Sequence, residues 1–345
     1  MKTEMLEKKP IHLLSELETE TAIAELKSKF AKSLSKRLNL VKVEAPLIVK
    51  KGTGVNDDLN GIERPVKIEV KQLHDVPVEI VHSLAKWKRS KLGRLKLEAG
   101  GGLYTDMRAL RPDEDFTDVH SIYVDQWDWE RAIDVTDRSL SYLQSIVKEI
   151  YASVLETETH ITSLYPKLKP YLPETISFIH SEELQALYPD LTPKQREDKI
   201  AREKGAVFII GIGGDLVDGK PHDGRAPDYD DWTTKTGEGT KGLNGDIIVW
   251  NKVLGRAFEI SSMGIRVSPE SLKVQLQLSE QEKRAGLKWH QQLLKGELPY
   301  SIGGGIGQSR LAMLLLQKRH IGEVQASIWP DETVGSLYGS EIAYL

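Results

Sequence analysis

Apolar residues near the start of the chain follow a helical period and then a strand period. Spacings of three and four predict a helix through Ile23, Leu26, Phe30, Leu34 and Leu38. Val41 and Val43 then alternate with polar residues, which predicts a strand that Pro46 ends. A glycine-rich loop and a hairpin are predicted next, at residues 51–61, 66–70 and 78–80.

The later pattern predicts helices and strands that do not repeat a β–α–β unit. The predicted strands occupy residues 122–129, 206–212, 247–250 and 256–263. The predicted helices occupy residues 137–164, 192–204, 269–278, 287–294 and 307–317, with Thr192 as an N-cap and Gly205 as a stop. Because the strands mostly follow one another as hairpins, we expect an α+β fold in which helices flank a mainly antiparallel sheet. We expect one domain over residues 1–345, with residues 1–20 as a lead-in.

Composition excludes several classes of protein. The 47 basic and 51 acidic residues leave a net charge of −4, which argues against a dedicated nucleic-acid or membrane-surface binder. No apolar run approaches the ~18 residues of a membrane span, and the start lacks a signal-peptide core, so we expect a cytoplasmic protein. The absence of cysteine excludes disulfides, thiolate metal sites and a cysteine nucleophile. The nine histidines show no zinc-site spacing, and we expect His82 and His120 to pack in strands.

Three stretches carry candidate chemistry, although each also has a plain structural interpretation. In residues 103–115, Arg108 and Arg111 precede an acidic turn, and an arginine beside acids is usually a surface ion pair. In residues 258–264, Glu259 lies either on the polar face of an ordinary strand or beside phosphates, where its carboxylate holds Mg²⁺. Glycines 303–305 predict either a tight turn before a helix or the close approach of a ligand, and Arg310 follows them. A dinucleotide-binding fold is excluded, because no second strand–helix unit follows these glycines.

In this order the three stretches resemble the motifs of class II aminoacyl-tRNA synthetase catalytic domains. The resemblance implies that Arg111 contacts the α-phosphate of ATP and that Arg310 contacts its γ-phosphate. It also implies that Glu259 and Ser262 hold Mg²⁺ and phosphate, and that the helix and strand ending at Pro46 form a homodimer interface. Elementary chemistry agrees, because guanidinium groups match phosphoryl oxygens and Mg²⁺ needs only one or two protein carboxylates.

Strand geometry conflicts with one of these assignments. Ideal alternation puts Ser261, and not Ser262, on the same face as Glu259. A β-bulge or a strand end near Ser261 resolves the conflict, so we expect such an irregularity there.

A narrower resemblance covers residues 21–329. Six segments are similar to the ammonia-dependent asparagine synthetases, or aspartate–ammonia ligases: residues 82–89, 109–115, 123–130, 225–232, 243–247 and 261–266. The resemblance implies that the β-carboxylate of aspartate attacks the α-phosphate of ATP, giving β-aspartyl-AMP and pyrophosphate, and that ammonia then displaces AMP to give L-asparagine. Two features depart from the pattern. Residues 1–10 extend the usual start, and Arg-Pro-Asp at 111–113 replaces the common Arg-x-Glu, so adenine contacts are not carried over.

The same resemblance implies roles around the aspartate substrate. Asp128 and Asp230 are the expected carboxylates for its α-amino group, and Lys88 is the expected partner of one of its carboxylates. Asp57 and Gln126 are expected at the end where ammonia attacks, since ammonium must be attracted and then deprotonated.

Two further residues and two loops complete the expected site. Arg225 is a candidate for the α-carboxylate of aspartate, and Asp246 is expected near the nucleotide, although it also fits a solvated strand start. We expect the glycine-rich loops at 51–61 and 213–242 to close over the substrate and exclude water.

Other functions remain open from the sequence. A tRNA-charging enzyme for aspartate or asparagine shares this core, but we expect no room for an anticodon-reading module and therefore no tRNA partner. An enzyme that activates an amino acid to modify another molecule needs no such module. The retained Arg111, Glu259 and Arg310 argue against a catalytically inactive relative. Glutamine-dependent asparagine synthetases release ammonia with an N-terminal cysteine, so free ammonia is the expected nitrogen donor of this cysteine-free chain.

Overall fold

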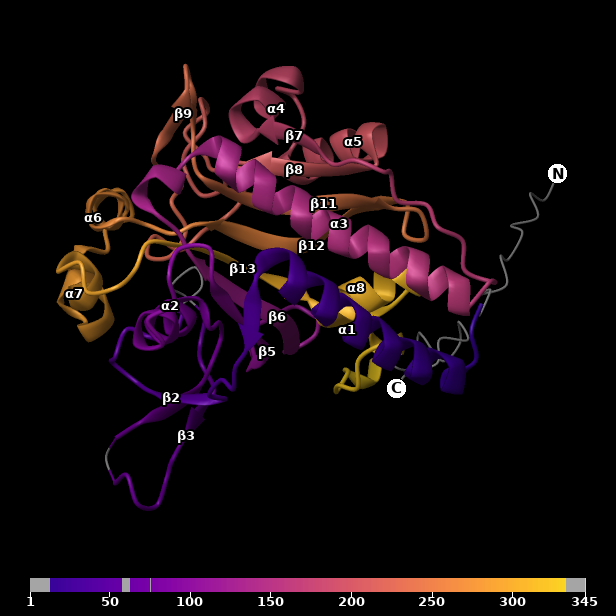
Figure 1. The fold of residues 1–345 in the computed structure, drawn as a ribbon, viewed down its shortest axis with the longest axis horizontal. Coiled ribbons are helices and arrows are strands. Elements are labelled where there is room, and N and C mark those ends of the chain that lie inside the picture. Colours follow the sequence, from indigo (N-terminus) through magenta and orange to yellow (C-terminus); the bar gives the residue numbers. More distant parts are fainter. Residues whose placement is uncertain (1–12, 58–62, 75, 333–344) are drawn as a thin grey trace.

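The computed structural model describes residues 13–57, 63–74, 76–332 and 345. Its centre is an eight-stranded sheet with the strand order β1-β5-β6-β13-β12-β11-β8-β7 (Figure 1). The inner pairs are antiparallel, whereas β1 pairs with β5 and β7 with β8 in parallel at the two edges. The expected α+β fold is confirmed, with a sheet that is mostly antiparallel but mixed. Residues 1–12 of the expected lead-in lie outside the described residues.

The strands of this sheet come from distant parts of the chain. They are β1 (Leu40–Lys42), β5 (Gly102–Leu110), β6 (Tyr123–Ala132), β7 (Ser177–His180), β8 (Ala206–Ile210), β11 (Asn244–Asn251), β12 (Arg256–Ile265) and β13 (Ser301–Gly307). Because β13 lies between β6 and β12, the glycines at 303–305 lie beside residues 128–130 and 262–264, which belong to segments expected to form the site.

Two long helices cover one face of the sheet. These helices, α1 (Glu16–Leu38) and α3 (Leu140–Leu164), lie alongside each other (Figure 1). α1 begins earlier than predicted, because Ser15 caps it and Glu18 bonds back to the Ser15 backbone. Phe30 of α1 packs on Trp127 of β6, with ring centroids 4.4 Å apart. The apolar side of α8 (Gln308–Leu315) joins the same cluster, so this face of the sheet holds the main core.

The opposite face of the sheet carries polar side chains, because successive side chains of a strand point to opposite sides. Along β6, Trp127 and Trp129 belong to the core, and Gln126, Asp128 and Glu130 alternate with them. The helix α2 (Ala85–Arg94) lies over this polar face, and α6 (Pro269–Leu278) and α7 (Lys288–Leu294) lie near it (Figure 1).

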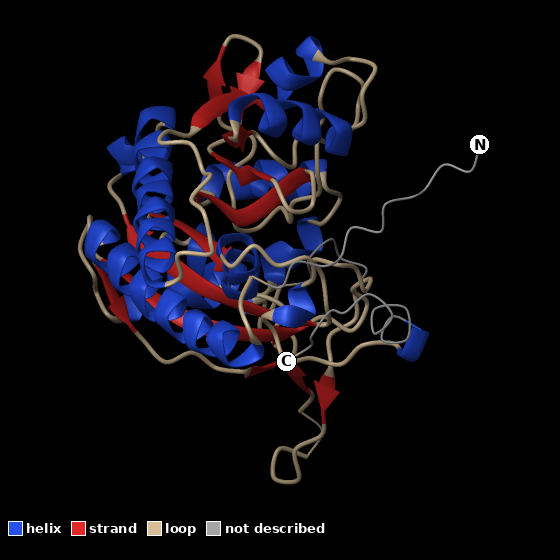
Figure 2. Cartoon of the chain, turned by 90° about the vertical axis from the view of Figure 1, so that its right-hand side faces the viewer, coloured by secondary structure: helices blue, strands red, loops and turns tan. Residues whose placement is uncertain are grey.

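Smaller elements surround the main sheet. A three-stranded sheet of β2 (Ile48–Lys50), β4 (Val78–Ile80) and β3 (Lys67–Ile68) projects at the lower end of the molecule (Figures 1 and 2). Its β3–β4 pair confirms the predicted hairpin, although β2 was not predicted. The remaining elements are α4 (Ser181–Leu187), α5 (Pro193–Lys204), β9 (Lys235–Gly237), β10 (Thr240–Lys241) and the short 3-10 helices Val135–Asp137, Glu282–Gly286 and Ile321–Glu323. Within the described ranges, no helix is long and apolar enough to cross a membrane.

Local sequence signals located some elements and missed others. The helix α5 begins after Thr192 and ends before Gly205, as predicted. The predicted turn at glycines 303–305 is wrong, because they lie inside β13. The prediction for His82 and His120 is also wrong, because both lie in irregular segments next to strands. The elements α2, β5, β7 and α4 were not predicted.

Candidate active site

Glycines of β13 form the floor of a hollow on the polar face of the sheet. Gly303 pairs with Glu130 and Gly264, and Gly305 pairs with Asp128 and Ser262. A Cβ atom on Gly305 would overlap Oε1 of Gln126 and lie 2.9 Å from Oδ1 of Asp128. The missing side chains therefore leave the space into which the polar side chains of β6 fold.

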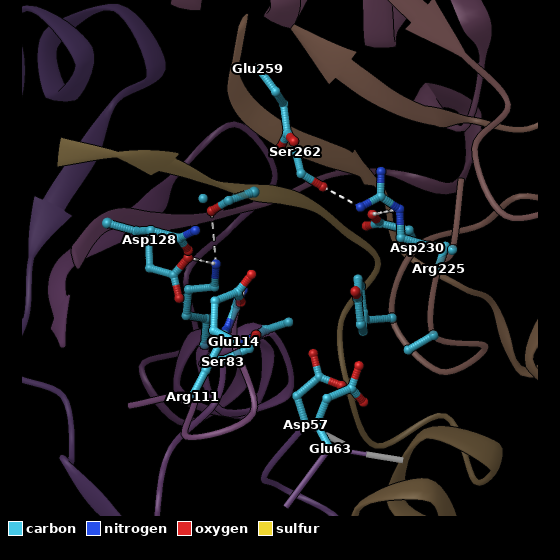
Figure 3. Close-up of a pocket in the computed structure, with 18 of the residues that line it drawn as sticks. Asp57, Glu63, Ser83, Arg111, Glu114, Asp128, Arg225, Asp230, Glu259 and Ser262 are labelled. Carbon is cyan, nitrogen blue, oxygen red and sulfur yellow. Dashed lines mark hydrogen bonds and ion pairs between the residues drawn. The ribbon is translucent and has the colours of Figure 1, made fainter. Parts of the chain in front are cut away.

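A pocket of about 410 Å³ opens over this floor, within the usual size range of small-molecule sites (Figure 3). Most of the residues expected from the sequence line it: Asp57, Lys88, Arg111, Gln126, Asp128, Arg225, Asp230, Glu259 and Ser262. Asp246 is bonded to one of these, and Arg310 lines an adjacent cavity of about 200 Å³. The fold thus brings all the expected residues into one region, although their individual roles stay predictions.

Lys88 reaches the pocket floor from the helix α2. Its Nζ atom donates to the backbone oxygen of Gly304 at 2.9 Å and lies 3.0 Å from Oδ1 of Asp128. Burial lowers the pKa of Lys88, and the carboxylate of Asp128 opposes this effect. Among the described residues, the buried Oδ2 atom of Asp128 has no hydrogen-bond partner, so it is available to a donor group of a ligand.

Arg266 and Glu130 form a buried charge cluster that the sequence reasoning missed. Arg266 follows β12, donates to Oε2 of Glu130 at 2.8 Å and also bonds Oδ1 of Asp230. Ser301 donates to the other oxygen of Glu130 at 2.7 Å. Burial alone would lower the pKa of Arg266, but Glu130 and Asp230 outweigh burial and raise it. The signal for this cluster was available, since Gln126, Asp128 and Glu130 are polar at every second position of a predicted strand.

A β-bulge in β12 brings Glu259 and Ser262 into the pocket together. Ile247 of β11 pairs with Ser261, and the next residue pairs with Glu259, so Ile260 is the extra residue. The expected irregularity near Ser261 is therefore confirmed. Ser262 lines the main pocket. Ser261 is buried, its hydroxyl donates to the backbone oxygen of Gly305 at 3.0 Å, and it lines the adjacent cavity instead.

Arg225 joins two walls of the pocket from the loop at 213–242. Its guanidinium donates to Oδ1 of Asp246 at 2.6 Å and to Oγ of Ser262, and its Nε atom lies 3.7 Å from Asp230 (Figure 3). The pKa of Asp246 is raised to about 6, because burial and the nearby charge of Glu259 raise it by more than Arg225 lowers it. The guanidinium thus neutralises a carboxylate that was expected at the nucleotide.

The adjacent cavity contains the second expected phosphate arginine. Arg310 of α8 donates to the backbone oxygen of Glu259 at 3.0 Å and lies 3.5 Å from its carboxylate. The Nε2 atom of His120 lies 2.6 Å from Arg310, and burial together with the charge of Arg310 lowers the pKa of this histidine to about 4. Arg111, Gln126 and Glu259 line both this cavity and the main pocket, so the two spaces share a boundary.

The residues near Glu259 fit a magnesium ion that is bound chiefly by phosphate and water. The charge of Glu259 contributes to the raised pKa of Asp246, so a cation bound beside both carboxylates would relieve their repulsion. In the part of the chain that the structure describes, no group of three or more histidines and carboxylates is arranged as a complete metal cage. Mg²⁺ beside phosphates usually takes only one or two carboxylates from the protein, and this arrangement is what Glu259 with Asp246 or Ser262 offers.

Comparison with known proteins identifies the family. A family model described as aspartate–ammonia ligase matches residues 17–340. A relative from Bacteroides fragilis named aspartate–ammonia ligase is 56% identical over 320 residues, which is 93% of each chain. The chain belongs to the aspartate–ammonia ligase family. A family member from Parabacteroides distasonis is 54% identical, again over 93% of both chains.

Solved structures place the fold of this aspartate–ammonia ligase family member beside the class II synthetases. Asparaginyl-tRNA synthetase from Pyrococcus horikoshii, complexed with asparaginyl-adenylate, superposes with a TM-score of 0.66 at 15% identity. The match covers 90% of this chain and 70% of that chain. The asparaginyl-tRNA synthetase from Entamoeba histolytica gives a TM-score of 0.63 at 17% identity, over 90% of this chain and 67% of that chain. The expected class II synthetase-like fold is confirmed.

Proposed function

We propose that the protein synthesises L-asparagine from L-aspartate and ammonia, using ATP through a β-aspartyl-AMP intermediate and releasing AMP and pyrophosphate. One observation carries the proposal: a single pocket joins groups that suit phosphates to groups that suit an amino acid. Arg111 and Glu259 line both the main pocket and the cavity of Arg310, and Lys88 and Asp128 lie on the pocket floor. Membership of the family and the class II fold support the same reaction.

Activation of the β-carboxylate is the first step. A carboxylate is a poor acyl donor, because O²⁻ cannot leave, and transfer of AMP to the β-carboxylate creates a good leaving group. In our proposal, Arg111 holds the α-phosphate and Arg310 the γ-phosphate of ATP, while Glu259 and Ser262 are the residues that would hold Mg²⁺. A bound Mg²⁺ neutralises phosphate charge. The protein itself aligns the carboxylate with the α-phosphorus, and its fixed charges need little reorganisation during the reaction.

Recognition of aspartate uses charges that are already paired in the fold. In our proposal, the α-ammonium group binds Asp128, whose Oδ2 atom has no hydrogen-bond partner among the described residues, and Asp230. Lys88 and Arg266 supply positive charge near the substrate carboxylates, because both line the pocket. Arg225 donates to Asp246 and Ser262, and its Nε atom has no hydrogen-bond partner among the described residues, so in our proposal it is a further donor for the α-carboxylate.

Ammonia is the second substrate. In our proposal, ammonium enters near Asp57 and Gln126 and loses a proton. Neutral ammonia then attacks the β-carbonyl carbon of the adenylate, AMP leaves with the electron pair of the broken acyl–oxygen bond, and the new amide loses a proton. Asp57 lies beside Glu63 on one wall of the pocket (Figure 3), so two carboxylates give this wall the negative charge that attracts ammonium.

Product analysis of the purified full chain tests the proposal. We expect asparagine, AMP and pyrophosphate in equal amounts from ATP, Mg²⁺, aspartate and ammonium, with no requirement for tRNA. Glutamine in place of ammonium should give no asparagine. Release of ADP, or adenylate formation only when tRNA is present, would contradict this function.

A further inference from the structure

A second buried charge cluster lies outside the pocket and is centred on Asp228. One oxygen of this carboxylate, Oδ2, accepts hydrogen bonds from Lys86 at 2.9 Å, from Arg284 at 3.0 Å and from His290 at 2.9 Å. Asp228, Lys86 and His290 are at most 1% exposed. None of these four residues lines the pocket, so substrate contact does not account for the cluster.

Asp228 and its partner Lys86 lie on two different segments that also carry pocket residues. Lys86 is on α2, two residues before Lys88. Asp228 itself is in the loop between Arg225 and Asp230. The carboxylate therefore ties the segment that carries Arg225 and Asp230 to the helix that carries Lys88.

The segment that leads to the pocket residue Asp57 contacts the same cluster through α7. Trp289 donates from its indole to the backbone oxygen of Lys86 at 2.9 Å and from its backbone to Thr53 at 3.2 Å. Gly54 lies directly on His290, since a Cβ atom there would be 3.1 Å from Nδ1 of the ring. The segment that leads to Asp57 thus packs on Trp289 and on His290, which is itself a member of the cluster.

We propose that Asp228 is a positioning residue for aspartate: it sets the relative placement of Lys88, of Arg225 with Asp230, and of the segment that carries Asp57. The inference rests on the proposed function, because it assigns these walls to the amino-acid substrate. The residues proposed to bind ATP phosphates lie on other elements, on β12, on α8 and after β5, and none of them contacts the cluster.

The electrostatics explain why the charge of Asp228 matters as well as its shape. Burial alone would raise the pKa of Asp228, but Lys86, His290 and Arg284 together lower it far below its usual value, so the group is ionised. Asparagine has almost the same shape, and its amide oxygen can occupy the position of Oδ2. The variant Asp228→Asn therefore keeps an acceptor and removes the negative charge that faces Lys86 and Arg284.

Comparison of aspartate and ATP binding in variants tests the inference. We expect Asp228→Asn to raise KM for aspartate at least tenfold and KM for ATP no more than about threefold, because the cluster reaches Ser262 and Asp246 through Arg225. Lys86→Met, which leaves Arg284 and His290 on the carboxylate, should raise KM for aspartate about threefold and serves if the first variant does not fold. Calorimetric titration with aspartate should show the same loss of affinity without turnover.

A matched control separates positioning from general stability. Glu158 is a buried carboxylate of α3 that accepts hydrogen bonds from the backbone of Tyr171 and Leu172, and it is not in the pocket. Glu158→Gln should lower thermal stability and leave both KM values unchanged. Unchanged aspartate affinity in both cluster variants, or an equal rise for aspartate and ATP, would overturn the inference. Failure of the unaltered protein to form asparagine would instead contradict the proposed function.

Discussion

Charged residues of the pocket are paired with one another before any substrate is present. Lys88 contacts Asp128, Arg225 contacts Asp246, and Arg266 joins Glu130 to Asp230. Such pairing holds the side chains in place, so substrates find fixed charges and little reorganisation follows. Resemblance to known motifs supplied most of these residues, but not their partners. Glu130 and Arg266 are 136 positions apart in the sequence, and only the strand order of the sheet shows that they meet.

The space above Gly305 yields a first prediction. We expect Gly305→Ala to lower kcat/KM for aspartate roughly 100-fold, equivalent to about 2.7 kcal/mol, because the added Cβ displaces Gln126 and Asp128. The measurement is steady-state kinetics together with thermal denaturation. Gly286→Ala is the matched control, since a Cβ there meets nothing within 4 Å, and it should keep full activity. Equal effects of the two variants would contradict the idea that the bare floor makes room for the pocket.

The raised pKa of Asp246 gives a second prediction. Because the pKa is about 6, the carboxylate is ionised above this pH and becomes protonated as the pH falls below it. We expect affinity for an ATP analogue with Mg²⁺ to fall by about tenfold per pH unit below 6. Calorimetric titration between pH 5 and pH 8 measures the effect. ATP phosphates also titrate, so Asp246→Asn is the required control and should show a weaker pH dependence than the unaltered protein.

Protonation of Asp246 should have the opposite effect on the stability of the unliganded protein: it should raise the free energy of unfolding. A folded-state pKa above the ordinary value of 3.8 means that the folded protein binds the proton more tightly than the unfolded chain. The contribution of Asp246 to stability is therefore full below pH 4 and is lost as the pH rises through 6. A carboxylate that favours ATP and Mg²⁺ binding thus costs stability at neutral pH when the pocket holds no ligand.

Secondary-structure elements differ in how far local sequence reveals them. α5 and α6 were predicted with their bounds because each has a cap and a proline at its start. β13 was hidden because glycine is unfavourable in strands, and it is tolerated here since neighbouring side chains fill the space above it. α2 was missed because half of its residues are basic, although Lys86, Lys88 and Arg89 turn inward to partners from distant segments.

One irregularity could be predicted because two kinds of reasoning disagreed. Strand alternation placed Ser261 on the face of Glu259, whereas resemblance placed Ser262 there, so a bulge or a strand end near Ser261 was expected. The structure has that bulge at Ile260. By contrast, the parallel pairings of β1 with β5 and of β7 with β8 have no local signal, since each depends on where distant strands enter the sheet.

The loop at 213–242 yields an element-scale prediction. Residues 225–232 are mostly buried, and Arg225, Asp228 and Asp230 bond to Asp246, Lys86 and Arg266. Residues 217–221 are exposed instead, and Val217 is 95% exposed. We expect hydrogen exchange of residues 215–221 to slow at least fivefold when aspartate and a non-hydrolysable ATP analogue bind, because this part of the loop closes over them. Peptides of α3 should be unaffected. The same exchange with and without ligands would rule out closure.

At the scale of the whole molecule, the central sheet separates two tasks. One face is covered by α1, α3 and α8 and holds the apolar core (Figure 1). The other face holds the pocket, to which α2 contributes Ala85 and Lys88. The face assignment follows from the alternation along β6, where two buried tryptophans interleave with Gln126, Asp128 and Glu130. A change in the core should therefore lower stability without directly removing a substrate contact.

Association of two chains is the last prediction and concerns the segment that joins α1 to the small sheet. Val41, Leu47 and Ile48 are 52%, 52% and 42% exposed there, although each is a large apolar residue. Resemblance to class II synthetases placed a homodimer interface in this region, and the exposed side chains are consistent with a surface that a second copy covers. We expect sedimentation analysis to give twice the mass of one chain, 38.8 kDa.

A paired substitution tests where that interface lies. Leu47→Asp should produce monomers, because association would bury an unpaired carboxylate. Leu278→Asp changes a leucine of α6 that is 64% exposed and lies outside the expected interface, so this variant should remain dimeric and active. Since β1 pairs directly with β5, and Arg111 follows β5, loss of the partner at this edge should also reduce ATP binding. A monomer with unchanged ATP affinity would show that the two copies do not support each other's sites, and a dimeric Leu47→Asp variant would place the interface elsewhere.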